Sequence, residues 1–126
     1  MAAQTPEEVD SLFEKFANAG DLDGLMTLYE PGATLNFGAP ATGLMAIRQV
    51  LHGVIGANPK ISLNVTSVIP GGDDVALVYA SYELSMDGPD GNRQQLSGKT
   101  VEVMRKQTDD TWLFVIDDPN GRSPAP

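Results

Sequence analysis

The sequence has 126 residues, of which 41% are hydrophobic and 20% are charged, and this length and composition are typical of one globular domain. Its 17 acidic and 8 basic residues give a formal net charge of -9, so we expect neither nucleic acid nor an anionic membrane as a partner. Because the chain has no cysteine, disulfides, thiolate nucleophiles and zinc-thiolate sites are excluded.

The two ends of the sequence predict the cellular location of the protein and the bounds of its ordered core. Residues 1–8 lack the basic region and apolar run of a secretion signal, and no stretch approaches the roughly 20 apolar residues of a membrane span. We therefore expect a cytoplasmic protein. Residues 1–126 form one predicted domain with an ordered core over about 5–119, and residues 120–126 are expected to be a mobile tail.

Two helices are predicted at the start of the chain. The first follows Thr5, whose side chain can accept a hydrogen bond from the amide of Glu8 while the Glu8 carboxylate reaches back, an arrangement known as a capping box. Pro6 suits the first helical position, and Asn18-Ala19-Gly20 ends the helix. Asp21 then caps a second, shorter helix that ends before the segment 29–32.

The pattern changes from helical to extended in the second half of the chain. Residues 33–37 are a brief extended segment, residues 38–41 are a loop, and a third helix follows Thr42 and ends near Gly56. Beyond residue 60, apolar and polar residues alternate with a period of two, which is typical of half-buried strands. Four strands joined by tight turns are predicted at 61–66, 74–86, 96–107 and 112–118.

This order of elements predicts an α+β domain in two layers, because helices come first and strands afterwards. We expect three N-terminal helices to pack on the concave face of a curved mixed or antiparallel sheet. The helices would fill the resulting cone only in part. The remaining space is expected to be a largely apolar pocket for a small hydrophobic molecule.

The register of the last predicted hairpin determines which of its residues share each face of the sheet. With Asp109 and Asp110 at the centre of its turn, Glu102 lies opposite Asp117, and Arg105 opposite Phe114. The face richer in aromatic and branched residues is assigned to the cavity and comprises Val101, Val103, Arg105, Trp112, Phe114, Ile116 and Asp118. We expect the other face to pack on a second subunit in a homodimer, and it comprises Thr100, Glu102, Met104, Lys106, Leu113, Val115 and Asp117.

The predicted pairing of Glu102 with Asp117 places two like charges directly opposite one another. A proton shared by the two carboxyl groups would raise one of their pKa values and create an acid-base site. In the interpretation that we favour, both carboxylates instead point to water beside Lys99 and Lys106.

Short motifs along most of the chain carry a family resemblance. They are NAGDLDG at 18–24, LY at 28–29, ATL at 33–35, the helix start at 43–48 and WLFVIDDP at 112–119. In these motifs the sequence resembles the nuclear transport factor 2-like superfamily, and more narrowly its ketosteroid isomerases and SnoaL-like polyketide cyclases. The resemblance spans roughly residues 5–119 and implies a cone-shaped, cystatin-like fold that forms a dimer.

At most positions that correspond to the catalytic residues of the ketosteroid isomerases, this sequence has other residue types. The tyrosine that donates to the oxyanion in that family falls at Phe13, and the general-base aspartate falls at Phe37 or Asn36. A supporting tyrosine falls at Leu51. The protonated aspartate of the family falls near Val101 or Glu102, of which only the glutamate can carry a proton.

Other residues are therefore the candidates for chemistry and binding. The candidate catalytic residues are Asp118, Glu102 and Tyr29. The candidate ligand-binding residues are Phe13, Phe16, Asn36, Phe37, Leu51, Tyr82, Val103, Arg105, Trp112, Phe114 and Ile116. The single histidine, His52, lies off the apolar stripe of the third helix, so we expect no metal site and no cofactor.

Two functional hypotheses follow from the sequence. The first is a cofactor-independent isomerase or cyclase that moves a proton on a hydrophobic, oxygenated substrate. The alternative is a non-catalytic module for ligand binding or dimeric association, because apolar residues stand where the family has its catalytic groups. An epoxide hydrolase of related fold would need a carboxylate-arginine-carboxylate set, of which only Asp118 and Arg105 can be placed on one face.

Overall fold

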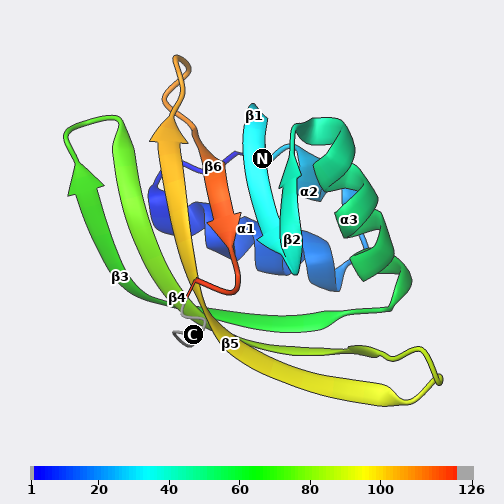
Figure 1. The fold of residues 1–126 in the computed structure, drawn as a ribbon. Coiled ribbons are helices and arrows are strands. Elements are labelled where there is room, and N and C mark those ends of the chain that lie inside the picture. Colours follow the sequence, from blue (N-terminus) through cyan, green and yellow to red (C-terminus); the bar gives the residue numbers. More distant parts are fainter. Residues whose placement is uncertain (1, 122–126) are drawn as a thin grey trace.

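The computed structural model describes residues 2–121 and has the predicted α+β architecture (Figure 1). Three helices and a curved sheet of six strands make up the fold. The elements are α1 (Pro6–Asn18), α2 (Leu22–Met26), β1 (Tyr29–Phe37), β2 (Ala39–Thr42), α3 (Leu44–Gly56), β3 (Lys60–Gly71), β4 (Val75–Asp87), β5 (Arg93–Lys106) and β6 (Trp112–Asp118).

The predicted caps of the first two helices are present. The Thr5 hydroxyl accepts from the Glu8 amide at 3.3 Å, and the Asp21 carboxylate accepts from the Gly24 amide at 2.9 Å. The Glu8 carboxylate does reach back, but it accepts from the amide of Gln4 at 2.6 Å. These contacts satisfy amides that the first turn of each helix would otherwise leave without an acceptor.

The sheet is mixed, with the strand order β2-β1-β6-β5-β4-β3. β1 runs parallel to β6, and every other neighbouring pair is antiparallel. The loop predicted at 38–41 is in fact a tight hairpin, in which Gly38 adopts a φ of 86° that favours glycine. β2 and the first residues of β1 were therefore not predicted from the sequence.

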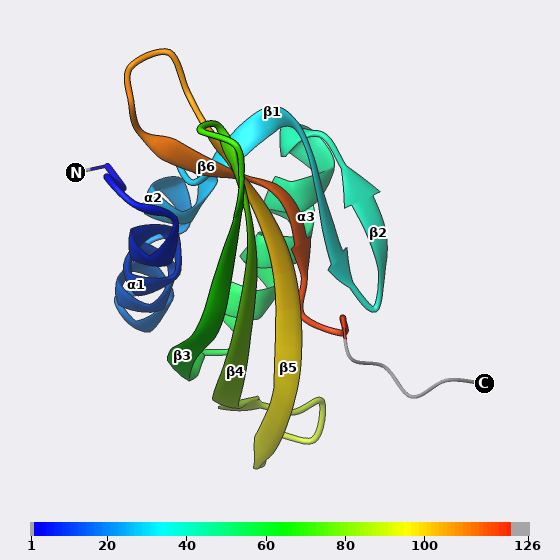
Figure 2. The ribbon, with the colours of Figure 1, turned by 90° about the vertical axis from the view of Figure 1, so that its left-hand side faces the viewer.

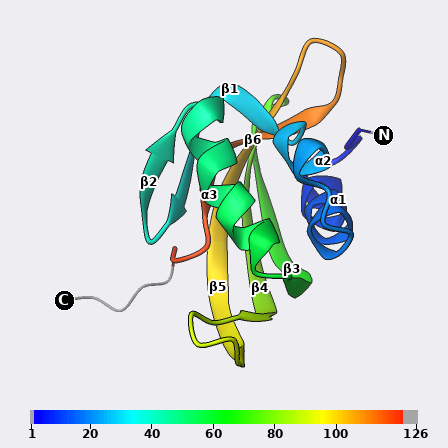
Figure 3. The same cartoon turned by 90° about the vertical axis from the view of Figure 1, so that its right-hand side faces the viewer.

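The helices lie against one face of the sheet and bury it. α1 contacts β3, β4 and β6, whereas α3 contacts β1 and β2, and Figures 2 and 3 show the two helices on the same side of the curved strands. Along β4 every second residue from Ala76 to Ala80 is buried, as expected for a sheet covered on one side. None of the helices within residues 2–121 combines the length and the apolar character needed to cross a bilayer.

A β-bulge in β6 changes the predicted register between β5 and β6. Glu102 pairs with Asp117, as predicted, but Arg105 pairs with Leu113 because Val115 is an extra residue in β6. Residues on either side of a bulge exchange faces, since side chains alternate along a strand. Phe114 is therefore buried on the inner face of the sheet, next to Met104, and not beside Arg105.

The end of the described chain folds back on the last strand. The amides of Asn120 and Gly121 both donate to Asp118, to its carboxylate and its carbonyl respectively, at 3.0 Å. Residues 120 and 121, the first two residues of the predicted mobile tail, are thus part of a turn. The rest of that predicted tail, residues 122–126, lies outside the described residues.

Candidate functional site

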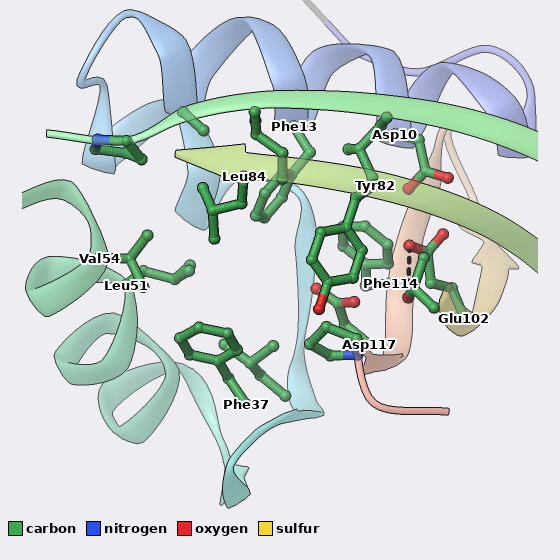
Figure 4. Close-up of a pocket in the computed structure, with 17 residues that line it drawn as sticks. Asp10, Phe13, Phe37, Leu51, Val54, Tyr82, Leu84, Glu102, Phe114 and Asp117 are labelled. Carbon is green, nitrogen blue, oxygen red and sulfur yellow. Dashed lines mark hydrogen bonds between the residues drawn. The ribbon is translucent and has the colours of Figure 1, made fainter. Parts of the chain in front are cut away.

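A pocket of about 70 Å³ lies between α1, the end of α3 and the inner face of the sheet (Figure 4). Its walls are mostly apolar. The lining residues are Asp10, Phe13, Ala17, Leu35, Phe37, Leu51, Val54, Pro59, Ile61, Leu63, Tyr82, Leu84, Thr100, Glu102, Phe114, Asp117 and Pro119. Among residues 2–121, no lysine, arginine or histidine lines this pocket, so its polar groups are carboxyls and hydroxyls.

Three carboxyl groups from three different elements meet in this pocket. Asp10 comes from α1, Glu102 from β5 and Asp117 from β6, and their exposed fractions are only 1%, 3% and 6%. The last two are brought together because their strands pair in register at this point. We refer to these three residues as the acid cluster. The favoured sequence interpretation, in which Glu102 and Asp117 point to water, is wrong.

Two hydroxyl groups donate hydrogen bonds to the acid cluster. The Tyr29 hydroxyl donates to Oδ2 of Asp117 at 2.6 Å, and its ring packs against Phe114 with ring centroids 4.9 Å apart. The Thr100 hydroxyl donates to Oε2 of Glu102 at 3.1 Å. Each donor is itself buried, so these bonds are shielded from water and hold the two carboxyl groups in place.

Three other oxygens of the cluster lack such donors. Within the described part of the chain, no donor reaches Oδ1 or Oδ2 of Asp10, or Oε1 of Glu102. The Asp10 and Glu102 carboxyls lie close enough to interact directly, and a proton held by one of them could form a hydrogen bond between the two. If both are ionised, three buried oxygens are left unsatisfied, which is unfavourable.

Burial raises the pKa values of all three carboxyl groups. It lifts the pKa of Asp10 from its usual 3.8 to about 6. For Asp117, burial outweighs the hydrogen bond from Tyr29, and with the nearby Asp10 and Asp118 charges it brings the pKa to about 7. Burial and the neighbouring charges of Asp10 and Asp117 place the pKa of Glu102 well above its usual range. The cluster therefore retains protons near neutral pH.

Tyr82 completes the polar part of the pocket. It extends from β4, and its hydroxyl points toward Asp117 (Figure 4). Partial burial, followed by the charge of Asp117, raises the pKa of this hydroxyl. Tyr82 therefore stays protonated at neutral pH and can donate a hydrogen bond into the pocket. A second tyrosine, Tyr29, has a strongly raised pKa for the same reasons and is also a donor.

The structure brings six of the predicted site residues together in the pocket. They are Phe13, Phe37, Leu51, Tyr82, Glu102 and Phe114. Tyr29 lies behind Asp117 and does not line the pocket. Asp118, a candidate catalytic residue, and Asn36 also lie outside the lining, where the Asn36 amide donates to the Asp118 carboxylate at 3.2 Å. Phe16 and Trp112 pack against the buried core without reaching the pocket.

The predicted assignment of the two sheet faces is wrong, and the bulge at Val115 does not by itself explain the error. Val103, Arg105 and Ile116 point to the outer face, where Ile116 is 43% exposed and the Arg105 guanidinium pairs with Glu30 at 2.8 Å. The face expected to contact a second subunit is the inner one, since Glu102, Met104 and Asp117 are buried within the chain. The prediction placed the face richer in aromatic and branched residues inside. The inner face is in fact the one that carries Glu102 and Asp117, which are buried despite their charge.

One central residue of the site, Asp10, was not predicted from the sequence. It precedes Phe13 by three positions and Ala17 by seven, the spacing of one helical face. That spacing was the available signal. Asp117 was identified as the partner of Glu102 but was placed on the wrong face. Within residues 2–121, no set of three His, Cys, Asp or Glu side chains could hold a metal ion.

Comparisons with known proteins identify relatives of this fold. The sequence model of the SnoaL-like domain family matches residues 9–113. A search of curated protein sequences finds no match. Among solved structures, a ketosteroid isomerase-like protein from Erwinia carotovora is 15% identical, with a TM-score of 0.77 and 89% of each chain covered.

Two further solved structures have similar scores. A nuclear transport factor 2-like protein with a cystatin-like fold from Novosphingobium aromaticivorans is 18% identical, with a TM-score of 0.71 over 88% of this chain and 75% of that one. A Xanthomonas campestris protein, provisionally assigned as a calcium/calmodulin-dependent protein kinase II association domain, is 20% identical, with a TM-score of 0.74 over 93% and 91%. At such identities the likeness establishes the fold alone.

Proposed function

Because this chain belongs to the SnoaL-like branch of the nuclear transport factor 2-like superfamily, we propose that it is a cofactor-independent isomerase or cyclase. It would move a proton on a small hydrophobic molecule that carries a carbonyl oxygen. One observation carries the proposal: the Asp117 carboxyl is buried in an apolar pocket and has a pKa of about 7.

Asp117 is the proposed general base. A base whose pKa lies near the working pH is present in its ionised form and still binds a proton strongly. The Tyr29 hydroxyl, 2.6 Å from Oδ2, fixes the orientation of the carboxylate and leaves Oδ1 to face the substrate. Tyr29 is thus a positioning residue, since it does not line the pocket.

Tyr82 is the proposed donor to the substrate oxygen. When Asp117 takes a proton from the carbon next to the carbonyl, the electron pair of the broken C–H bond moves into the carbonyl and leaves a negative charge on its oxygen. A hydrogen bond from the Tyr82 hydroxyl would stabilise that charge. Return of the proton from Asp117 to a different carbon of a conjugated substrate completes an isomerisation. Attack of the carbanion on an internal carbonyl forms a carbon-carbon bond and an alkoxide, and return of the proton from Asp117 to that alkoxide completes a cyclisation.

The size of the pocket limits the substrate. Pockets for drug-sized ligands usually measure about 300–1,000 Å³, whereas this one has about 70 Å³. Because a buried water needs roughly 10–15 Å³ of such space, the pocket would hold about five waters, or a ligand with a similar number of heavy atoms. We therefore propose a substrate much smaller than a steroid.

Deuterium exchange into a small ketone tests this proposal without knowledge of the natural substrate. The full-length protein would be incubated with cyclopentanone in D₂O, and loss of the protons next to the carbonyl would be followed by NMR. We expect exchange above the buffer rate with the unaltered protein and with the control Asp73→Asn, which changes an exposed turn carboxyl. Exchange that is equally fast in Asp117→Asn would contradict the proposal.

One observation favours the non-catalytic alternative. Phe13, Phe37 and Leu51 all line the pocket, so the positions at which the sequence comparison places the isomerase groups are apolar. A binding module of this kind would gain thermal stability with a small apolar ligand but would exchange no protons of cyclopentanone. Proton exchange that depends on Asp117 would exclude this alternative.

A further inference from the structure

Asp10 and Glu102 take no part in the proton transfer proposed above, although both are buried and line the pocket. They contribute the three buried oxygens that have no donor among the described residues. Isolated buried charges are costly in proteins, and they usually occur beside a partner of opposite charge. The pocket itself supplies no such partner, because no basic side chain of residues 2–121 lines it.

We propose that Asp10 and Glu102 bind the protonated amino group of a small apolar ligand. A primary ammonium group has three N–H donors, and the two carboxyls present three oxygens that need them. The apolar walls formed by Phe13, Leu51 and Phe114 would receive the hydrocarbon part of the ligand. This inference rests on the proposed function, in that the same molecule would present a carbon-bound proton to Asp117.

Two simpler ways of satisfying these oxygens fit less well. A proton shared by Asp10 and Glu102 would satisfy one oxygen of each residue and leave the second Asp10 oxygen without a donor. A metal ion would need ligands around a common point, and the acid cluster does not form such a set within residues 2–121. An ammonium group supplies three directional N–H donors, one for each of the three oxygens.

Binding of an ammonium group should depend on pH, because the carboxyls must lose protons to accept its N–H donors. The titratable groups that act on this site are Asp10 on α1, Tyr29 on β1, Glu102 on β5, and Asp117 and Asp118 on β6, together with Tyr82 on β4. Asp10, Glu102 and Asp117, whose pKa values are raised, gain negative charge as the pH rises. Affinity for an ammonium ligand should therefore increase between about pH 5 and 7.5, whereas that for a neutral ligand of the same shape should not.

Calorimetric titration of the full-length protein with cyclopentylamine and with cyclopentanol tests the inference. The two probes have the same ring and differ in the ammonium group, which, like that of lysine, stays protonated at neutral pH. At pH 7.5 we expect cyclopentylamine to bind at least about tenfold more tightly than cyclopentanol. At pH 5 this preference should shrink, since the acid cluster then holds its protons.

Two variants test which carboxyl groups cause the preference for cyclopentylamine over cyclopentanol. Asp10→Asn and Glu102→Gln keep the side-chain shape but remove the negative charge, so each should reduce the preference for the amine severalfold. The exposed control Asp73→Asn should leave it unchanged. Two variants are included so that a folding failure of one, seen by circular dichroism, leaves the other as the test.

The outcomes separate this inference from the proposed function. Equal binding of amine and alcohol, absence of amine binding, or a preference that survives in both variants would overturn the ammonium site. Such a result leaves the proton-transfer proposal standing, because that proposal is tested with a neutral ketone. Conversely, an amine preference without any ketone exchange would support the site and contradict the proposed chemistry.

Discussion

At the scale of single residues, the site is governed by the burial of carboxyl groups. Asp10 and Asp117 have pKa values of about 6 and 7, and in both cases burial is the largest cause. The hydrogen bond from Tyr29 acts in the opposite direction on Asp117 and keeps its pKa from rising further. Ionisation of either carboxyl group therefore weakens the folded state.

The substitution Asp10→Asn should stabilise the protein at high pH and have little effect at low pH. The pKa of Asp10 is higher in the folded state, about 6, than its usual 3.8, so the folded state binds the proton more tightly than the unfolded chain. That stabilisation is complete below about pH 4 and is lost as the pH rises through about 6. Asparagine stays neutral, so the variant should gain up to about 3 kcal/mol relative to the unaltered protein.

Urea unfolding at pH 4 and at pH 7.5 measures this difference. The exposed control Asp73→Asn should show no comparable change between the two pH values. A variant that is equally stable, or less stable, than the unaltered protein at pH 7.5 would show that Asp10 is ionised in the folded state at little cost.

At the scale of secondary-structure elements, much of the fold could be predicted because its signals are local. Thr5 and Asp21 mark helix starts through hydrogen bonds to amides three residues away, and both are seen. The alternation along β4 also follows directly from the sequence. The hairpin of β1 and β2 was missed because Pro40 and Gly38 suggest a loop, although an edge strand tolerates proline.

The site was harder to predict because it depends on contacts between distant segments. The Glu102–Asp117 pairing could be read from the hairpin turn, but which face is buried depends on where α1 lies. Asp10 is a charged residue on an otherwise apolar helix face, and its sequence neighbours do not reveal whether carboxyls from β5 and β6 surround it. The bulge at Val115 likewise could not be predicted, because no turn residue marks its position in the sequence.

Deletion of Val115 tests the structural importance of the bulge. Without this extra residue, Phe114 would be forced to the outer face or the Asp117 side chain away from the pocket, because side chains alternate along the strand. Loss of a buried phenylalanine from the core costs about 3–5 kcal/mol. We therefore expect thermal unfolding many degrees lower, whereas deletion of Pro89 in the exposed β4–β5 turn should be tolerated far better.

At the scale of the whole molecule, the curved sheet has one covered face and one face that no helix of residues 2–121 covers. The uncovered face carries a row of apolar residues on four adjacent strands, formed by Ile69, Leu77, Val103 and Ile116. Ile69 is 50% exposed and Ile116 is 43% exposed. We expect the homodimer predicted from the sequence to use this row, because the face first assigned to it is buried within the chain.

Light scattering at micromolar concentration tests the predicted homodimer. The chain has a mass of 13.4 kDa, and we expect the measured mass to be twice that value. Ile116→Asp should shift it to the monomer, because a charge within an apolar contact loses its hydration. A monomer mass for the unaltered protein would end the prediction.

NMR titration of the side-chain carboxyl carbons of Asp10, Glu102 and Asp117 is the most direct test of the account, since both proposals depend on buried carboxyl groups whose pKa values are raised toward neutral pH. Interacting groups titrate as a set, so the informative result is the position of the midpoints and not their assignment to single residues. We predict midpoints at about 6 and about 7, and a third that lies well above the usual range of a glutamate. If all three carboxyls titrate with midpoints near their usual values of about 4, the acid cluster holds no proton at neutral pH and the account is contradicted.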